Sequence, residues 1–225
     1  MDLYIDPAAT TSRAVLAFCH AAELAPVIRP VALMRGEHHL GPFAAMNPNC
    51  MVPVLVDGDL VLTEAAAILT HLARTIDSPL YPATLVERAR VDERIGWFGT
   101  NFYKDFGYQF VYPQILPQHR RATDEATHAT IEWGREQSRR WLAVLEKWIG
   151  PERRHLVGER LTIADYYGAS IASLGELIGS AFAGYPNTQR WYAEITNDRS
   201  WRAINGAFLG FAEAIRIRGH SFVTL

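Results

Sequence analysis

Cysteine and histidine side chains are the first candidates for redox or metal chemistry in this chain. The two cysteines, Cys19 and Cys50, lie far apart and lack the spacing of a metal site, so we expect reduced thiols. His38 and His39 are adjacent, but no third ligand motif accompanies them. The sequence therefore predicts no metal centre.

Hydroxyl side chains form a second candidate group, at a turn near the N-terminus. Thr10, Thr11 and Ser12 follow a short apolar run, Leu3–Ile5, which Pro7 interrupts. A hydroxyl can donate a hydrogen bond to a charged group, an interaction worth about 1.5–3 kcal/mol. Ser12 opens a helical pattern, and we predict it to be the N-cap of that helix.

Two acidic residues stand at predicted helix starts. Glu64 precedes an alanine-rich segment, where a carboxylate complements the helix dipole. Thr162-Ile163-Ala164-Asp165 has the Ser/Thr-x-x-acid pattern of an N-cap, so we expect Thr162 and Asp165 to satisfy free N–H groups at the start of a helix. The role of Asp165 is then in folding.

The elements that position these residues alternate between strand and helix in the first third of the chain. We expect a strand at Leu3–Ile5, a helix from Ser12 through Leu24, and a parallel strand at Val27–Leu33. Asp57-Gly58 between two apolar runs is a strong signal for a tight hairpin. A helix from Thr63 or Glu64 to the vicinity of Ile76 completes a four-stranded mixed sheet carrying helices.

The rest of the chain is predicted to be helical. A proline-rich segment that includes Pro79 and Pro82 is typical of a linker, so we expect a first domain over 1–77, a linker over 78–86 and an all-helical domain over 87–225. Helical patterns cover residues 85–112, 123–149, 163–177, 186–197 and 201–215.

Composition restricts the classes of function. Hydrophobic residues make up 49% and charged residues 20%, as in compact globular proteins. The 22 Lys and Arg against 24 Asp and Glu form no basic patch, so nucleic acid and anionic membranes are not expected partners. The N-terminus lacks the pattern of a signal peptide and no run is long enough to span a membrane, so we expect a cytoplasmic protein.

The order of elements, together with local motifs, resembles the cytosolic glutathione transferases, most closely their theta-like bacterial branch. The resemblance covers essentially the whole chain. It depends on the order and spacing of motifs at residues 47–49 (Asn-Pro-Asn), 52–55 (Val-Pro-Val-Leu), 57–58 (Asp-Gly), 62–64 (Leu-Thr-Glu) and 161–165 (Leu-Thr-Ile-Ala-Asp).

The resemblance implies a thioredoxin-like domain that holds glutathione as co-substrate. It implies a cis peptide bond before Pro53, so that Val52 offers its backbone N–H and C=O to the cysteinyl part of glutathione. Glu64 would accept the α-ammonium of the γ-glutamyl group. His38 would contact the glycyl carboxylate. The implied glutathione-binding residues are His38, Met51, Val52, Pro53, Glu64 and Ala65.

The resemblance also implies that a hydroxyl at the first turn activates the thiol by lowering its pKa. Where theta-like members carry the catalytic serine this chain has Ala9, so we predict Thr10 as the activating residue and Thr11 as the second candidate. Met51 stands where many relatives have lysine, and Ala65 where they have serine. Anchoring of the glutathione carboxylates should therefore be weaker.

The resemblance implies that the aromatic-rich helix over 85–112 supplies the apolar pocket for the electrophile. Phe102, Tyr103 and Phe106 are the candidate pocket residues. The same helix and the first domain are implied to form a homodimer interface. The sequence thus predicts a detoxifying glutathione transferase acting on small hydrophobic electrophiles. The alternative is a binding or interaction protein of this fold, in which the changes at Ala9, Met51 and Ala65 have weakened catalysis.

Overall fold

A four-stranded sheet forms the first part of the chain, in the computed structural model that describes residues 1–180, 182–217 and 221–225. The strand order is β2-β1-β3-β4. β1 pairs with β2 in parallel and with β3 antiparallel, and β4 pairs antiparallel with β3. The strands are β1 (Asp2–Ile5), β2 (Val27–Pro30), β3 (Val54–Asp57) and β4 (Leu60–Leu62).

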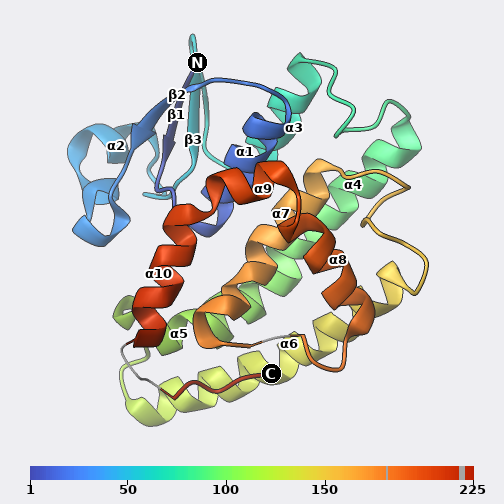
Figure 1. The fold of residues 1–225 in the computed structure, drawn as a ribbon. Helices are drawn as coiled ribbons and strands as arrows, with labels where there is room; N and C mark the ends of the chain where they lie inside the picture. Colours follow the sequence, from blue (N-terminus) through green and yellow to red (C-terminus); the bar gives the residue numbers. More distant parts are fainter. Residues whose placement is uncertain (181, 218–220) are drawn as a thin grey trace.

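Helices cover both faces of this sheet (Figure 1). α1 (Thr10–Ala21) and α3 (Ala65–Thr75) lie on one side, and α2 (Gly41–Met46) lies on the other. Leu3 and Ile5 of β1 belong to the large core shared with α1 and α3, whereas Tyr4 packs in a small cluster with Phe43 of α2. Successive strand residues point to opposite faces, so the apolar run at the N-terminus serves both layers.

The segment between β2 and β3 differs from the prediction. β2 ends at Pro30 instead of Leu33, and two single turns of 3-10 helix follow, η1 (Leu33–Arg35) and η2 (Glu37–His39). Pro30 has no N–H to donate to a strand ladder, which favours the end of the strand. The same stretch also contains α2, which has a proline in its first turn.

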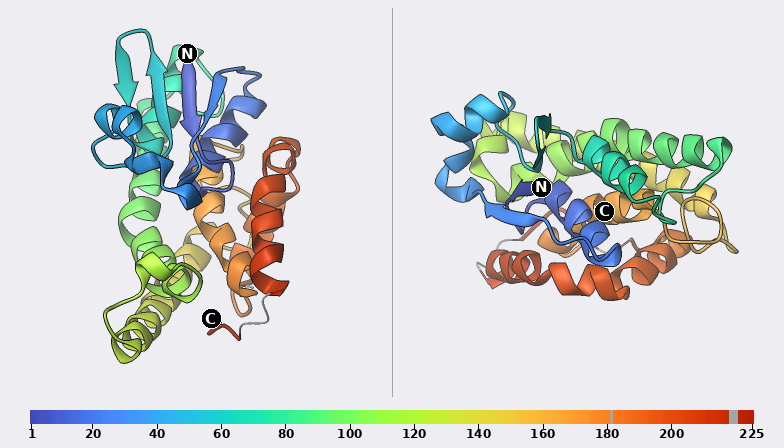
Figure 2. Two further views of the ribbon diagram at one scale, coloured as in Figure 1. Left: turned by 90° about the vertical axis from the view of Figure 1, so that its left-hand side faces the viewer. Right: turned by 90° about the horizontal axis from the view of Figure 1, so that it is seen from above.

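The remainder of the described chain is helical, which confirms the predicted combination of a thioredoxin-like sheet and a helical part. α6 packs along η3, and α7 packs against α1 and so joins the two parts. Figure 2 shows the helical part extending away from the sheet. The elements are α4 (Leu85–Trp97), η3 (Phe98–Val111), α5 (Tyr112–Ile115), η4 (Pro117–His119), α6 (Asp124–Ile149), α7 (Ile163–Ala172), η5 (Ser173–Ile178), α8 (Pro186–Thr196), α9 (Arg199–Ile204) and α10 (Gly206–Ile217).

The middle of the first long helix is a π-helix, η3, where the sequence pattern predicts an α-helix. Hydrogen bonds from i to i+5 widen each turn and change which residues share a face. One face carries four fully buried phenylalanines, at positions 98, 102, 106 and 110. Tyr103, Tyr108 and Tyr112 have rings in mutual contact, so they form a separate aromatic group.

Two predicted helix boundaries are wrong. Ser12 is not an N-cap, because α1 begins two residues earlier with Ala9 at the N-cap position. The Ser12 side chain is buried, and its hydroxyl has no hydrogen-bond partner among the described residues. The last predicted helix is divided into α9 and α10 at Asn205, and Asp198 caps α9 by accepting bonds from the backbone N–H groups of Ser200 and Trp201.

The predicted cap at Thr162 and Asp165 is confirmed as a capping box. The Asp165 carboxylate accepts hydrogen bonds from the backbone N–H of Thr162 at 2.8 Å, from that of Leu156 at 2.9 Å and from Trp191 Nε1 at 2.9 Å. Asp165 therefore fixes two further segments besides its own helix. Within the described ranges, none of the helices has the length and apolar character needed to cross a bilayer.

Candidate active site

The loop before β3 ends in the cis peptide bond Val52–Pro53, as the family resemblance implies. Asn47 holds this loop in place. Its side chain is fully buried, donates to the Met51 carbonyl at 2.7 Å and accepts from the backbone N–H of Asn49 at 3.0 Å. The Asn-Pro-Asn motif therefore has a positioning role, which the sequence analysis did not assign.

Thr11 connects the first turn of α1 to this corner. Its hydroxyl donates to the Val52 carbonyl at 3.2 Å. Residues 41 positions apart in the sequence are thereby brought together at the junction of β3 and α1. The bond engages the only proton of the Thr11 hydroxyl, which leaves Thr10 as the better candidate to donate to a ligand at this turn.

Thr10 is the end of a chain of three hydroxyl groups. Its Oγ1 lies 2.9 Å from the Tyr112 hydroxyl, which lies 2.8 Å from the Tyr103 hydroxyl. Burial raises the pKa of Tyr112 to about 12 and the pKa of Tyr103 well above its usual value, so both phenols stay protonated near neutral pH. If Tyr112 donates to Thr10, the Thr10 proton is free to point elsewhere.

Glu64 occupies the N-cap position of α3, and Ala65 begins the helix. The Glu64 side chain is exposed, and its carboxylate has no hydrogen bond or ion pair with any described residue. Burial is the main cause of the raised pKa of Tyr108 and of the pKa of about 12 of Tyr167, and the negative charge of Glu64 raises both pKa values further. The Glu64 charge therefore acts on the helical part. An unpaired acid at this place suits a cationic group of a ligand.

His38 and Met51 come from the segment between β2 and β3. His38 belongs to η2; its Nδ1 is buried without a described partner, and burial followed by the neighbouring His39 lowers its pKa. His38 is therefore neutral near pH 7. Met51 is 54% exposed in the loop that ends at the cis bond. The described residues contain no group of three or more His, Cys, Asp or Glu that could hold a metal ion.

The three predicted pocket aromatics separate into two groups. Phe102 and Phe106 have no exposed surface and stack on each other with ring centroids 4.7 Å apart, so in this structure they belong to the core and do not face an open pocket. Tyr103 alone lies on the Thr10 side. Phe102 and Phe106 continue the row of buried rings that Phe98 begins and Phe110 ends, whereas Tyr103 follows Phe102 directly in the sequence and so points to another side of the helix.

The two cysteines have different surroundings. Burial raises the pKa of Cys19 to about 12, which makes its thiol unreactive at neutral pH. Cys50 is a free, partly exposed thiol in the loop before the cis bond, with a φ of 53°. It lies outside the turn that carries Thr10.

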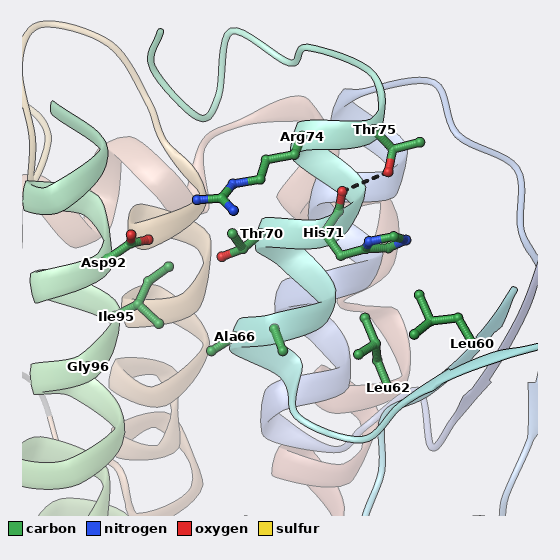
Figure 3. A pocket seen from close by; sticks show the side chains of 11 residues that line it. Leu60, Leu62, Ala66, Thr70, His71, Arg74, Thr75, Asp92, Ile95 and Gly96 are labelled. Carbon is green, nitrogen blue, oxygen red and sulfur yellow. Dashed lines mark hydrogen bonds between the residues drawn. The ribbon is translucent and has the colours of Figure 1, made fainter. Parts of the chain in front are cut away.

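An open groove of about 790 Å³ lies away from these residues, between α3, α4 and the edge strand β4 (Figure 3). Leu62, Ala66, Ile95 and Gly96 supply its small and apolar surface. Arg74 and Asp92 face each other across it, and Tyr81 links them, accepting from Arg74 at 3.3 Å and donating to Asp92 at 3.0 Å. The groove includes none of the predicted site residues.

Comparison with known proteins agrees with this arrangement. Residues 2–74 match the family model "Glutathione S-transferase, N-terminal domain", and residues 106–198 match "Glutathione S-transferase, C-terminal domain". Human glutathione S-transferase theta-2 is 31% identical over 220 residues, covering 93% of this chain and 82% of the relative. Human glutathione S-transferase theta-1 is 30% identical over 209 residues, covering 87% and 82%.

Solved structures agree as well. The structure of human glutathione transferase theta-2 in complex with glutathione and an unknown ligand has a TM-score of 0.84 and 26% identity, covering all of this chain and 93% of that chain. A delta-class glutathione transferase from Nilaparvata lugens has a TM-score of 0.79 and 26% identity, covering 96% and 98%. The chain therefore belongs to the glutathione S-transferase family, and it is a glutathione transferase.

Proposed function

We propose that glutathione binds between the cis-proline corner and the start of α3, with its thiol beside Thr10. Val52 offers strand-like backbone pairing to the cysteinyl part. The unpaired carboxylate of Glu64 receives the α-ammonium group, and N–H groups at the start of α3 favour the α-carboxylate. His38, Met51, Pro53 and Ala65 complete the proposed contacts, with neutral His38 donating a hydrogen bond instead of forming an ion pair.

Thr10 is proposed to activate the thiol. Its hydroxyl accepts from Tyr112 and donates to the thiolate, and each bond in the Tyr103–Tyr112–Thr10 chain polarises the next. A thiolate is the nucleophile, and a free thiol with a pKa of about 8.5 is mostly protonated at neutral pH. The observation that carries this proposal is the buried chain of hydroxyls ending at the first turn of α1.

The electrophile is proposed to be a small hydrophobic compound, held by the tyrosine rings that face this turn. Tyr103 and Tyr108 are partly exposed, with ring centroids 5.0 Å apart, and Tyr112 lies beneath them. Thiolate attack on an electrophilic carbon then expels the leaving group. The alternative of a non-catalytic binding protein is not favoured, because the relatives named above are transferases.

Calorimetric titration with glutathione tests the binding site. Glu64→Gln is expected to weaken binding by about tenfold, because loss of a hydrogen-bonded charge costs about 1.5 kcal/mol or more. Glu136→Gln is the control, because it makes the same change in net charge at an exposed residue of α6. Equal affinities for Glu64→Gln and wild type would contradict the site, and no heat from wild type at millimolar glutathione would contradict the function.

We also propose that the groove between β4, α3 and α4 is a homodimer interface. Apolar and small residues line it, and a two-fold pairing would bury the same patch on both copies. Sedimentation is expected to give twice the chain mass of 25.3 kDa. Ala67→Glu places a charge in the groove and should yield monomers, whereas Ala214→Glu, exposed on α10, should not. A monomeric wild type would contradict this interface.

Several finer assignments remain predictions. We retain the division into a glutathione-binding domain over 1–77, a linker over 78–86 and a helical domain over 87–225. Both cysteines are free, which fits the reducing cytoplasm. Membership of the bacterial branch of the theta-like transferases and a role in detoxification complete the proposal.

A further inference from the structure

A second cavity, of about 390 Å³, lies where η3 faces the connection between α5 and α6. This connection is seen at the lower left of Figure 1. Its lining is polar and rich in hydrogen-bond donors. Of the described residues that line it, none is acidic and four carry or can acquire a positive charge. They are Lys104, Tyr108, Gln109, Gln118, His119, Arg120 and Arg121.

The positive charge of this cavity is only partly compensated. Lys104 Nζ lies 3.8 Å from Asp105, and Arg120 lies 2.6 Å from Asp124. Asp105 also accepts from Gln109 and from Trp141 Nε1, both at 2.7 Å. Three permanent cations thus face two carboxylates, before any charge on His119 is counted.

Arg121 supplies the uncompensated charge. Its backbone N–H donates to Thr127 Oγ1 at 2.9 Å and its Nε donates to Thr130 Oγ1 at 3.2 Å. These partners are neutral, and Arg121 has no ion pair with a carboxylate in the described parts of the chain. Thr127 thereby holds the backbone of Arg121 and Thr130 holds its guanidinium at the cavity, with donors left for an anion.

Tyr108 and His119 connect the cavity to the tyrosine group that contacts Thr10. The His119 ring lies over Tyr112 with centroids 5.0 Å apart and over Tyr108 at 5.5 Å. Tyr108 in turn contacts Tyr112 at 5.2 Å, and Tyr112 holds the Thr10 hydroxyl. Tyr108 therefore borders both the cavity and the tyrosine group that contacts Thr10, and a ligand resting on Tyr108 lies between the two.

We propose that this cationic cavity binds the acidic group of the second substrate, so that the enzyme prefers hydrophobic electrophiles carrying a carboxylate or sulfonate. The inference rests on the proposed position of the thiol beside Thr10. In the reaction the thiol proton goes to solvent, the thiolate forms a bond to carbon, and the carbon–halogen bond breaks with its electron pair leaving as halide. Arg121 takes no part in these bond changes and orients the substrate.

Two benzylic chlorides that differ in charge test this proposal: 4-(chloromethyl)benzoate and its neutral methyl ester. For each, kcat/KM with glutathione is divided by the uncatalysed rate, and the acid-to-ester ratio is compared between variants. Wild type should favour the acid at least fivefold. Arg121→Gln should reduce the ratio about fivefold through a higher KM, as expected for one charge–charge contact of about 1 kcal/mol. Ester turnover should stay within twofold.

Controls separate this cavity from general electrostatics. Arg139→Gln removes an exposed cation elsewhere on α6 and should leave the ratio unchanged. Benzoate should inhibit turnover of the acid competitively, and less strongly in Arg121→Gln. A wild-type ratio near one, an equal fall in Arg139→Gln, or benzoate binding that does not compete would each overturn the inference while the transferase assignment stands. Turnover of neither compound would contradict the proposed function together with the inference.

Discussion

Thr10, the residue proposed to activate the thiol, has little exposed surface. The side chain is 6% exposed, so its conformation is fixed by packing and by the bond to Tyr112. A β-branched side chain has few rotamers, which adds to this preorganisation. The structure also distinguishes it from Thr11, whose hydroxyl is engaged with the Val52 carbonyl.

Thr10→Val keeps the shape of the side chain and removes the donor. We expect the pKa of the bound glutathione thiol to rise by roughly one to two units, as the loss of one charge-assisted hydrogen bond implies. Turnover near neutral pH should fall in parallel. Ultraviolet absorbance of the thiolate against pH measures the shift, with Thr11→Val as the matched variant. A shift in Thr11→Val alone would transfer the role to Thr11, and no shift in either would leave activation to backbone N–H groups at the helix start.

At the scale of elements, the contact between η3 and α6 determines where the tyrosines lie. Gly134 of α6 permits a close approach, because a Cβ added there would meet the backbone carbon of Gln109 at 2.6 Å and the nitrogen of Phe110 at 2.7 Å. Backbone atoms cannot move aside as a flexible side chain can. The two helices can therefore pack at this distance only with glycine at position 134.

Gly134→Ala is expected to lower the free energy of unfolding by about 1–3 kcal/mol, the usual cost of overpacking. Gly210→Ala is the control, since a Cβ at Gly210 of α10 meets nothing within 4 Å and should stabilise by up to about 1 kcal/mol. Urea denaturation measures both. Equal free energies of unfolding for the two variants would contradict this prediction, because they would show that α6 can shift away from η3 without loss of stability.

At the scale of the whole molecule, Arg13 ties the first domain to the last helices. This α1 residue is fully buried, donates to Asn205 Oδ1 at 2.7 Å, to Ser173 Oγ at 2.7 Å and to the Ser170 carbonyl at 3.0 Å, and lies 3.7 Å from the centroid of the Phe208 ring. Burial lowers its pKa to about 10, so it remains charged at neutral pH. One side chain thus joins α1 to α7, η5 and α10.

Arg13→Ala should destabilise the protein by about 3–5 kcal/mol, because it removes these bonds and leaves a cavity. Arg29→Ala makes the same chemical change at an exposed ion pair with Asp2 and should cost less than about 1 kcal/mol. Thermal unfolding of both variants compares them. A small effect of Arg13→Ala would mean that the domains remain docked through apolar contacts alone.

The sequence by itself determined the features that depend on neighbouring residues. The hairpin signalled by Asp57-Gly58, whose turn residues are Gly58 at a φ of 59° and Asp59, and the capping box at Thr162 follow from local backbone chemistry, whereas the cis bond before Pro53 followed from the family resemblance. These local features depend on steric and hydrogen-bonding preferences of residues that are close in the sequence. The four-stranded sheet with a helical second part followed from the order of such signals.

Only the tertiary structure decided which side chains meet. Thr10 and Tyr112 are 102 positions apart, and no local pattern pairs them, because docking of the two domains brings them together. Phe102 and Phe106 lie in the core, whereas Tyr103 lies beside Tyr112 and Thr10, and only packing against neighbouring helices decided which of these aromatic side chains is buried. Gly134 of α6 allows η3 to pack closely against α6. This contact cannot be predicted from the residues of η3 alone.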